Sequence, residues 1–134
     1  MTITLSDQDK NTLRIGAYGA VTLLSAAGAA GGSPHRIATD GSIALGSATG
    51  LVGHVLAEYP KHKDLNGRSV AEIADRVLPA LTAASGLLKA RAPEEAANFR
   101  GAVLTALEAA THHAPPTPVM ADMIRKITEA IDAA

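Results

Sequence analysis

The sequence predicts an all-α fold, a single compact bundle of five to six helices within one domain over residues 1–134. Apolar residues recur every three or four positions through most of the chain, and no stretch sustains the alternation typical of a β-strand. Only 2% of the residues are aromatic, so Ala, Leu, Ile and Val must build the core. Helices with such small side chains are expected to pack closely, in an irregular or orthogonal arrangement.

The first helix is expected over about residues 7–29. Ser6, followed by Asp7 and Asp9, has the pattern of an N-cap with acidic residues in the first turn, where they complement the helix dipole. Gly31 and Gly32 are expected to end this helix. Its buried face is predicted to consist of Leu13, Ala17, Ala20, Val21 and Leu24.

The second helix is expected to end at Pro60, and its start remains open. Ser33 and Pro34 have the pattern of a helix start, but Asp40 and Gly41 interrupt the early part. Its core face is predicted to consist of Ala48, Val52, Val55, Leu56 and Tyr59.

Both helices contain glycines at spacings of three and four residues, Gly16 and Gly19 in the first and Gly46, Gly50 and Gly53 in the second. Each interior glycine costs about 1 kcal/mol relative to alanine, so we expect them to serve close backbone packing. The stripe in the second helix faces either the first helix or a second copy of the protein, and the internal arrangement is favoured.

Residues 60–68 are charged and rich in turn formers and are expected to form the main surface loop. Ser69 and Glu72 then have the spacing of a capping box, which predicts the start of the third helix. Pro79 lies inside the apolar pattern of that helix and predicts a kink or a split near Leu78. Its core face is predicted to consist of Val70, Ile73, Ala74, Val77, Leu81 and Leu88.

The fourth helix is expected to begin at Ala92 and Pro93, and the last at Thr117 and Pro118, after a connector over residues 112–118. Ion pairs four residues apart are predicted on the last helix between Asp122 and Lys126 and between Arg125 and Glu129. The buried faces of the two helices are predicted to consist of Ala96, Phe99, Val103 and Leu107, and of Met120, Met123, Ile124, Ile127 and Ile131.

Composition limits the classes of partner. The formal net charge is -1 and the basic residues are scattered, so no nucleic-acid partner is expected. The chain has no cysteine, which fits a reducing compartment, and its acidic N-terminus does not have the pattern of a secretory signal, so we expect a cytoplasmic protein. Residues 15–34 are uncharged but mostly small, so no stable membrane insertion is expected.

No motif supports catalysis. The glycines from Gly41 to Gly46 have the spacing of a phosphate-binding loop, but Ser47 and Ala48 stand where that loop needs lysine and a hydroxyl. His54 and Glu58 lie four residues apart and share a helix face, but two ligands do not make a metal site. No catalytic residue, cofactor or metal ligand is therefore assigned. His112 and His113 are expected to lie at a helix end and in solvent, which is favoured over a nickel or zinc site shared with His35 or His62.

The chain from Phe99 onward resembles the C-terminal helix pair of the TerB-like helical domains that are associated with tellurite resistance. The matching small and aliphatic residues are Val103, Ala106 and Ala110 on one helix and Ala121, Ile124, Ile127, Ala130 and Ile131 on the next. The resemblance implies a similar helical fold. Such domains commonly carry an acidic turn associated with metal binding, but the corresponding residues 112–118 contain no acid, so the metal function is not implied.

These patterns favour a non-catalytic cytoplasmic protein that acts through self-association, as a homodimer, or through a protein partner, with Gly46, Gly50 and Gly53 at the interface. The alternative is a small-ligand-binding protein or enzyme, with a pocket near His54 that the kink at Pro79 opens. The ligand-binding residues would then be Tyr18, His54, Glu58 and Tyr59. A further alternative is metal binding by the histidines.

Overall fold

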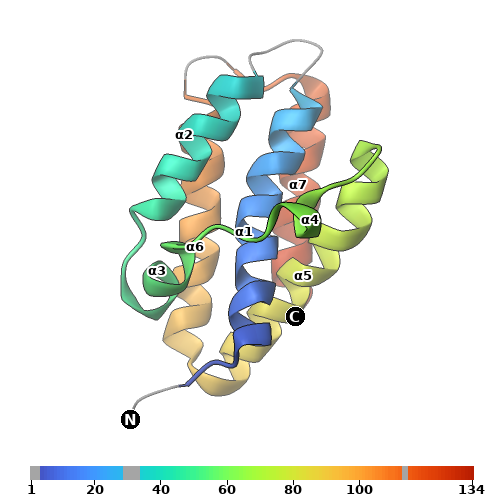
Figure 1. The fold of residues 1–134 in the computed structure, drawn as a ribbon. Coiled ribbons are helices and arrows are strands. Elements are labelled where there is room, and N and C mark those ends of the chain that lie inside the picture. Colours follow the sequence, from blue (N-terminus) through green and yellow to red (C-terminus); the bar gives the residue numbers. More distant parts are fainter. Residues whose placement is uncertain (1–3, 29–33, 113–114) are drawn as a thin grey trace.

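The computed structural model describes residues 4–28, 34–112 and 115–134. Within these ranges the chain forms seven helices and no strand (Figure 1). The helices are α1 (Asp7–Ala27), α2 (Pro34–Gly46), α3 (Gly50–Leu56), α4 (His62–Leu65), α5 (Val70–Arg91), α6 (Pro93–Ala110) and α7 (Pro118–Asp132). The all-α prediction is confirmed. The helices outnumber the expected five to six because the second expected helix is two helices and the expected loop contains the short α4.

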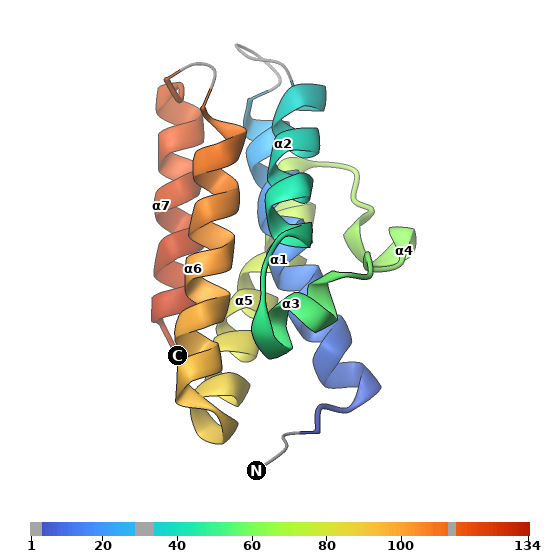
Figure 2. The ribbon, with the colours of Figure 1, turned by 90° about the vertical axis from the view of Figure 1, so that its left-hand side faces the viewer.

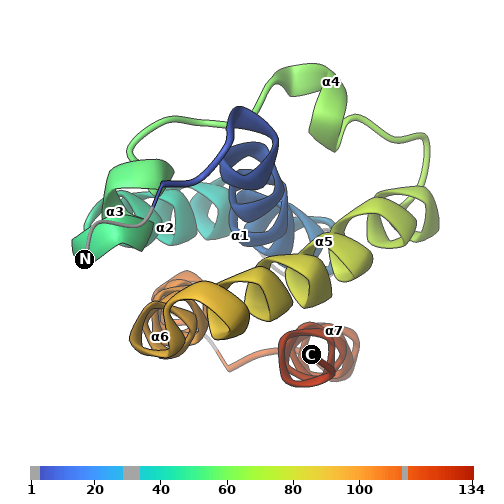
Figure 3. The same cartoon turned by 90° about the horizontal axis from the view of Figure 1, so that it is seen from below.

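The α1 helix lies between α2 and α5, and it contacts both (Figure 1). The α6 and α7 helices lie on the opposite side of the bundle from α4, and α3 contacts both α1 and α6 (Figures 2 and 3). None of the helices in the described ranges combines the length and the apolar character that crossing a bilayer requires.

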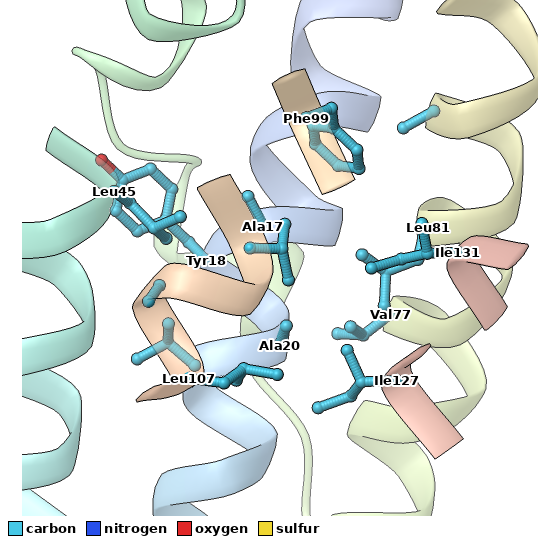
Figure 4. Packing of buried hydrophobic residues seen from close by; sticks show 14 of the residues in the cluster. Ala17, Tyr18, Ala20, Leu45, Val77, Leu81, Phe99, Leu107, Ile127 and Ile131 are labelled. Atoms are coloured by element: carbon cyan, nitrogen blue, oxygen red, sulfur yellow. The ribbon is translucent and has the colours of Figure 1, made fainter. Parts of the chain in front are cut away.

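The core is built from aliphatic side chains of α1, α2, α3, α5, α6 and α7 together with the single phenylalanine, Phe99 (Figure 4). Ala17 and Ala20 present small side chains from α1, opposite larger ones such as Val77 and Leu81 on α5. This pairing of small with large side chains lets an almost non-aromatic core fill its volume. The largest fully buried side chains, after Phe99, include Leu13, Leu23, Leu24, Leu45, Leu56, Leu81, Leu88 and Ile127.

Two glycines of α1 lie against α5, which confirms that they serve close packing. A Cβ atom built on Gly16 would lie 3.4 Å from the backbone N and Cα of Leu81. A Cβ built on Gly19 would overlap the side chain of Val77, with Cγ1 at 2.9 Å. The two helix backbones therefore approach each other more closely than larger side chains would permit.

The prediction of one continuous second helix is wrong. The α2 helix begins at Pro34 and continues through Asp40 and Gly41, because Gly41 lies against the Val21 side chain of α1. The helix ends at Gly46, and residues 47–49 separate it from α3.

The glycines that were expected to form one stripe therefore lie in different settings. Gly46 is exposed, and a Cβ built there would meet nothing within 4 Å. Gly50 has φ of +73°, a conformation that favours glycine. Gly53 is buried against the backbone carbonyl of Ala48. No α1 atom is among the nearest neighbours of a Cβ built on any of the three. The expected stripe against the first helix therefore does not form, because Gly46 ends α2 whereas Gly50 and Gly53 belong to α3.

The helix starts observed at Ser6 and Thr117 agree with those predicted from the sequence. Ser6 forms a full capping box with Asp9, and the Thr117 hydroxyl accepts from the Met120 amide. The box at Ser69 is half formed: the hydroxyl accepts from the Glu72 amide, but the Glu72 carboxylate accepts from Arg68 N–H instead.

Three other expectations have different outcomes. Pro79 does not split its helix, since α5 is continuous from Val70 to Arg91. The α1 helix ends at Ala27 with Gly28 as its C-cap, and the stop expected at 31–32 lies outside the described residues. The predicted ion pairs on α7 are confirmed, with Lys126 at 3.2 Å from Asp122 and Arg125 at 2.9 Å from Glu129.

Candidate functional site

The most distinctive surface feature is a hollow of about 410 Å³ between α1, α2 and the segment that joins α3 to α4. We call it the tyrosine hollow, because it contains both tyrosines of the chain. Its walls are mostly apolar, with a few hydroxyl groups, as is usual for small-molecule sites. The lining residues are Tyr18, Val21, Thr22, Ala38, Ser42, Tyr59, Pro60 and Leu65.

The two tyrosine rings contact each other at one wall of this hollow. Their centroids are 4.9 Å apart and their planes are tilted by 55°. Tyr18 is buried, and its hydroxyl donates to the carbonyl of Leu56 at the end of α3. Tyr59 is 70% exposed, so its ring is held against Tyr18 while most of its surface faces solvent. One ring is therefore fixed by the fold and the other is available for contact.

Burial raises the pKa of the Tyr18 phenol above its ordinary value. The neighbouring Tyr59 raises it further, and the positive charge of Arg14 acts in the opposite direction. The Tyr18 phenol is therefore neutral throughout the physiological pH range.

Hydroxyl groups occupy the other polar positions of the tyrosine hollow. Thr22 donates to the Tyr18 carbonyl at 2.9 Å, one turn earlier on α1. The hydroxyls of Ser42 and Tyr59 make no hydrogen bond in the part of the chain that the structure describes. These two groups can each donate and accept a hydrogen bond.

His54 and Glu58 do not lie in the tyrosine hollow. Both are exposed, and they border a separate, smaller hollow of about 310 Å³ beside the first turns of α1. Arg14 occupies that site: its Nε donates to Val55 O at 2.9 Å, and its guanidinium lies 3.3 Å from the Glu58 carboxylate. The lining residues of this charged hollow are Asp7, Lys10, Arg14, His54, Val55, Ala57 and Glu58.

The four residues expected to bind one ligand are thus divided between two hollows. Pro79 lines neither of them, so the expected opening by a kink does not apply. The sequence singled out Tyr18 and Tyr59 but not Ser42 or Leu65, which complete the hollow from α2 and α4. No local signal identifies those residues, because their position depends on how α2 and α4 pack beside α1.

A third hollow, also of about 410 Å³, lies between the end of α2 and α6. Its walls consist of small side chains and Asn98, and the 64% exposed Ile43 lines an adjoining hollow. This α2–α6 hollow has neither aromatic rings nor large aliphatic side chains, so it offers a small molecule less contact area than the tyrosine hollow. Its lining residues are Ala44, Ser47, Ala48, Thr49, Asn98, Gly101, Ala102 and Thr105.

The described histidines do not form a cluster that could bind a metal ion. Among residues 4–28, 34–112 and 115–134 there is no group of three His, Cys, Asp or Glu side chains that could hold a metal ion. His35 and His112 are exposed, and His113 lies outside the described residues.

No family model, no curated protein and no solved structure matches this chain. The fold and the tyrosine hollow therefore define its class: an all-helical protein with a small, mostly apolar surface hollow. The likeness of α6 and α7 to TerB-like domains stays a prediction.

Proposed function

We propose that this is a non-catalytic binding protein whose tyrosine hollow takes a small molecule. One observation carries the proposal: the chain has three aromatic residues, and two of them meet at the wall of a single hollow of about 410 Å³. A volume of this size lies within the range of small-molecule sites, roughly 300 to 1,000 Å³. The proposal adopts the ligand-binding alternative, with Tyr18 and Tyr59 as contact residues and without His54 and Glu58.

The exposure of Tyr59 supports this function. A large aromatic side chain that is 70% exposed leaves apolar surface in water, although Tyr18 holds it in place. A ligand that covers this ring removes that surface from water, at about 25 cal/mol for each Å² of apolar area. The ring is already oriented, so binding loses little conformational entropy at this position.

The test is a search for binding with neutral, anionic and cationic aromatic fragments, observed through the methyl resonances of Val21, Thr22 and Leu65 in the full chain. Binding should shift these resonances, and Tyr59→Ala should weaken it about tenfold or more, since about 1.4 kcal/mol of contact is lost. Ile43→Ala is the matched control, because Ile43 is similarly exposed but lies outside the hollow. Fragments that shift none of these methyl groups, or that bind Tyr59→Ala equally well, refute the proposal.

Self-association is the second candidate. Ile43 is 64% exposed beside the α2–α6 hollow, and Gly46 and Gly101 leave open space where a partner backbone can approach. Gly50 is unsuitable for a test, because its positive φ and the nearby Glu95 carboxylate would strain any substitution.

Gly46→Arg tests this second candidate, since it introduces bulk and charge into open space. If the protein forms dimers through this surface, sedimentation should show concentration-dependent association that Gly46→Arg abolishes without loss of helix content. A wild-type chain that remains monomeric at high concentration rules this function out.

We further propose that the protein is cytoplasmic, because the absence of cysteine fits a reducing compartment. We also propose kinship with TerB-like domains, for the fold of α6 and α7 alone.

A further inference from the structure

We propose that the occupant of the tyrosine hollow is a neutral, planar and largely apolar molecule that carries a hydroxyl or carbonyl group. This inference rests on the proposed function and specifies its ligand. It follows from the charge, the shape and the hydrogen-bonding capacity of the walls.

The uncharged lining of the tyrosine hollow disfavours ionic ligands. None of the eight lining residues carries a formal charge at neutral pH. Among the charged side chains on α1 and α4, Arg14 contacts Val55 and Glu58, and Asp64 accepts from Asn11 at 3.4 Å. Lys61 and Lys63 are exposed and do not line the hollow. An ion that enters the hollow loses hydration and gains no counter-charge, which is unfavourable.

The shape of the wall favours a planar group. The exposed ring of Tyr59 is tilted by 55° against Tyr18, and together the two rings form an angled aromatic surface. Aromatic rings prefer offset-stacked or edge-to-face contacts, at centroid separations of about 4.5 to 7 Å. A flat apolar ligand can make such a contact with Tyr59 while its edge lies against Val21 and Leu65.

Two hydroxyls provide the polar recognition. Ser42 on α2 and Tyr59 beyond α3 both line the hollow and make no hydrogen bond within the described ranges. Each hydroxyl can donate or accept, so a ligand hydroxyl or carbonyl is matched whichever role it takes. A purely apolar ligand that covers these two hydroxyls leaves them without a hydrogen-bond partner, so it is expected to bind less tightly.

Naphthalene and three derivatives of similar size test the inference on the full-length chain at pH 7: 2-naphthol, 2-naphthoate and 2-naphthylmethylammonium. Titrations are followed by the methyl resonances of Val21, Thr22 and Leu65. The 2-naphthol should bind at least about tenfold more tightly than either ion and more tightly than naphthalene. Combining Ser42→Ala with Tyr59→Phe should remove its advantage over naphthalene, because 2-naphthol loses its hydrogen-bond partners and naphthalene no longer covers unpaired hydroxyls.

Ser47→Ala is the control, because Ser47 directly follows α2, the helix that carries Ser42, but lines the α2–α6 hollow instead. This change should leave all four affinities unchanged. If either ion shifts the same methyl groups at lower concentration than 2-naphthol, the inference on ligand class is overturned while the proposed function stands. If none of the four compounds shifts these methyl groups, both the ligand class and the proposed function are overturned.

Discussion

Gly19 and Gly101 lie in opposite environments: the first is packed tightly against another helix, and the second is surrounded by open space. Gly19 on α1 lies directly against Val77 of α5, with no room for a methyl group. Gly101 on α6 is exposed, and a Cβ built there would meet nothing within 4 Å. The first glycine permits close helix packing, and the second only adds backbone freedom to the unfolded chain.

Gly19→Ala is expected to lower the free energy of unfolding by about 1 to 3 kcal/mol, because its methyl group overlaps the Val77 side chain. Combining it with Val77→Ala should cost less than the sum of the two single changes, since the smaller side chain makes room for the new methyl group. Urea unfolding of the wild type, both single variants and the double variant measures this coupling.

The matched control is Gly101→Ala, which should raise the free energy of unfolding by about 0.5 to 1 kcal/mol through helix propensity alone. A Gly19→Ala variant that is stabilised to the same degree would show that α1 and α5 are not in close contact at this point.

The α3 helix is the element whose existence depends most on its neighbours. At its start, the Glu95 carboxylate of α6 accepts from the amides of Leu51 and Val52, at 3.2 and 3.3 Å. At its end, Arg14 and Tyr18 of α1 donate to the last carbonyls. An acid at the N-terminus and a base at the C-terminus both complement the helix dipole. These contacts stabilise a helix of seven residues, which is too short to persist alone in water.

Glu95→Ala should therefore increase local opening of α3. We expect hydrogen exchange of the α3 amides to accelerate about tenfold, equivalent to about 1.4 kcal/mol, with smaller changes in α5 and α7. Glu94→Ala is the control, because Glu94 lies in the same first turn of α6 but is exposed and does not contact α3. Equal exchange rates in the two variants would contradict the capping role of Glu95.

At the scale of the whole molecule, ion pairs join different helices of the bundle. Arg100 on α6 contacts Asp132 at the end of α7 at 2.9 Å, and Arg91 on α5 contacts Asp9 on α1 at 2.8 Å. The hydrogen bond from Arg100 lowers the pKa of Asp132, and its positive charge adds to the effect. The pKa of Asp9 is lowered first by the hydrogen bond from the Ser6 amide and then by the Ser6 side chain and Arg91.

These lowered pKa values determine the sign of the pH dependence. A carboxylate with a lower pKa in the folded than in the unfolded state contributes stability above its unfolded pKa, and this contribution is lost as the pH falls through the folded pKa. Asp132→Asn should therefore lower the melting temperature slightly at pH 7 and reduce its further fall below about pH 4.

Thermal unfolding between pH 7 and pH 2 measures this difference, and the effect should shrink in high salt because the pair is exposed. The control is Asp75→Asn, because the Asp75 carboxylate contacts no cation in the described ranges. A variant of Asp132 with an unchanged acid-side slope would show that the pair does not form in solution.

The boundaries that were predicted correctly depend on local chemistry. Ser6, Pro93 and Thr117 begin helices because their capping groups and backbone angles act within one turn. The break over residues 47–49 was missed, because it is stabilised from α6, where Asn98 donates to Thr49 O at 2.8 Å. A periodic pattern of apolar residues continues across such a break and does not reveal it.

The candidate site divides in the same way. Tyr18 and Tyr59 were expected to bind one ligand, and the structure places these two rings together. The i, i+4 spacing of His54 and Glu58 suggested a shared site, but Arg14 arrives from α1 and engages Glu58. Sequence spacing cannot show which side chain from another helix reaches a surface.

The amino-acid sequence by itself determined the helical class, most helix starts and the small-residue composition of the core, because these depend on interactions within a few residues. The tertiary structure alone decided which glycines lie in contacts, where the second helix breaks and which side chains surround the tyrosines. Those features depend on contacts between helices, whose register and approach are decided by the packing of side chains that are distant along the chain.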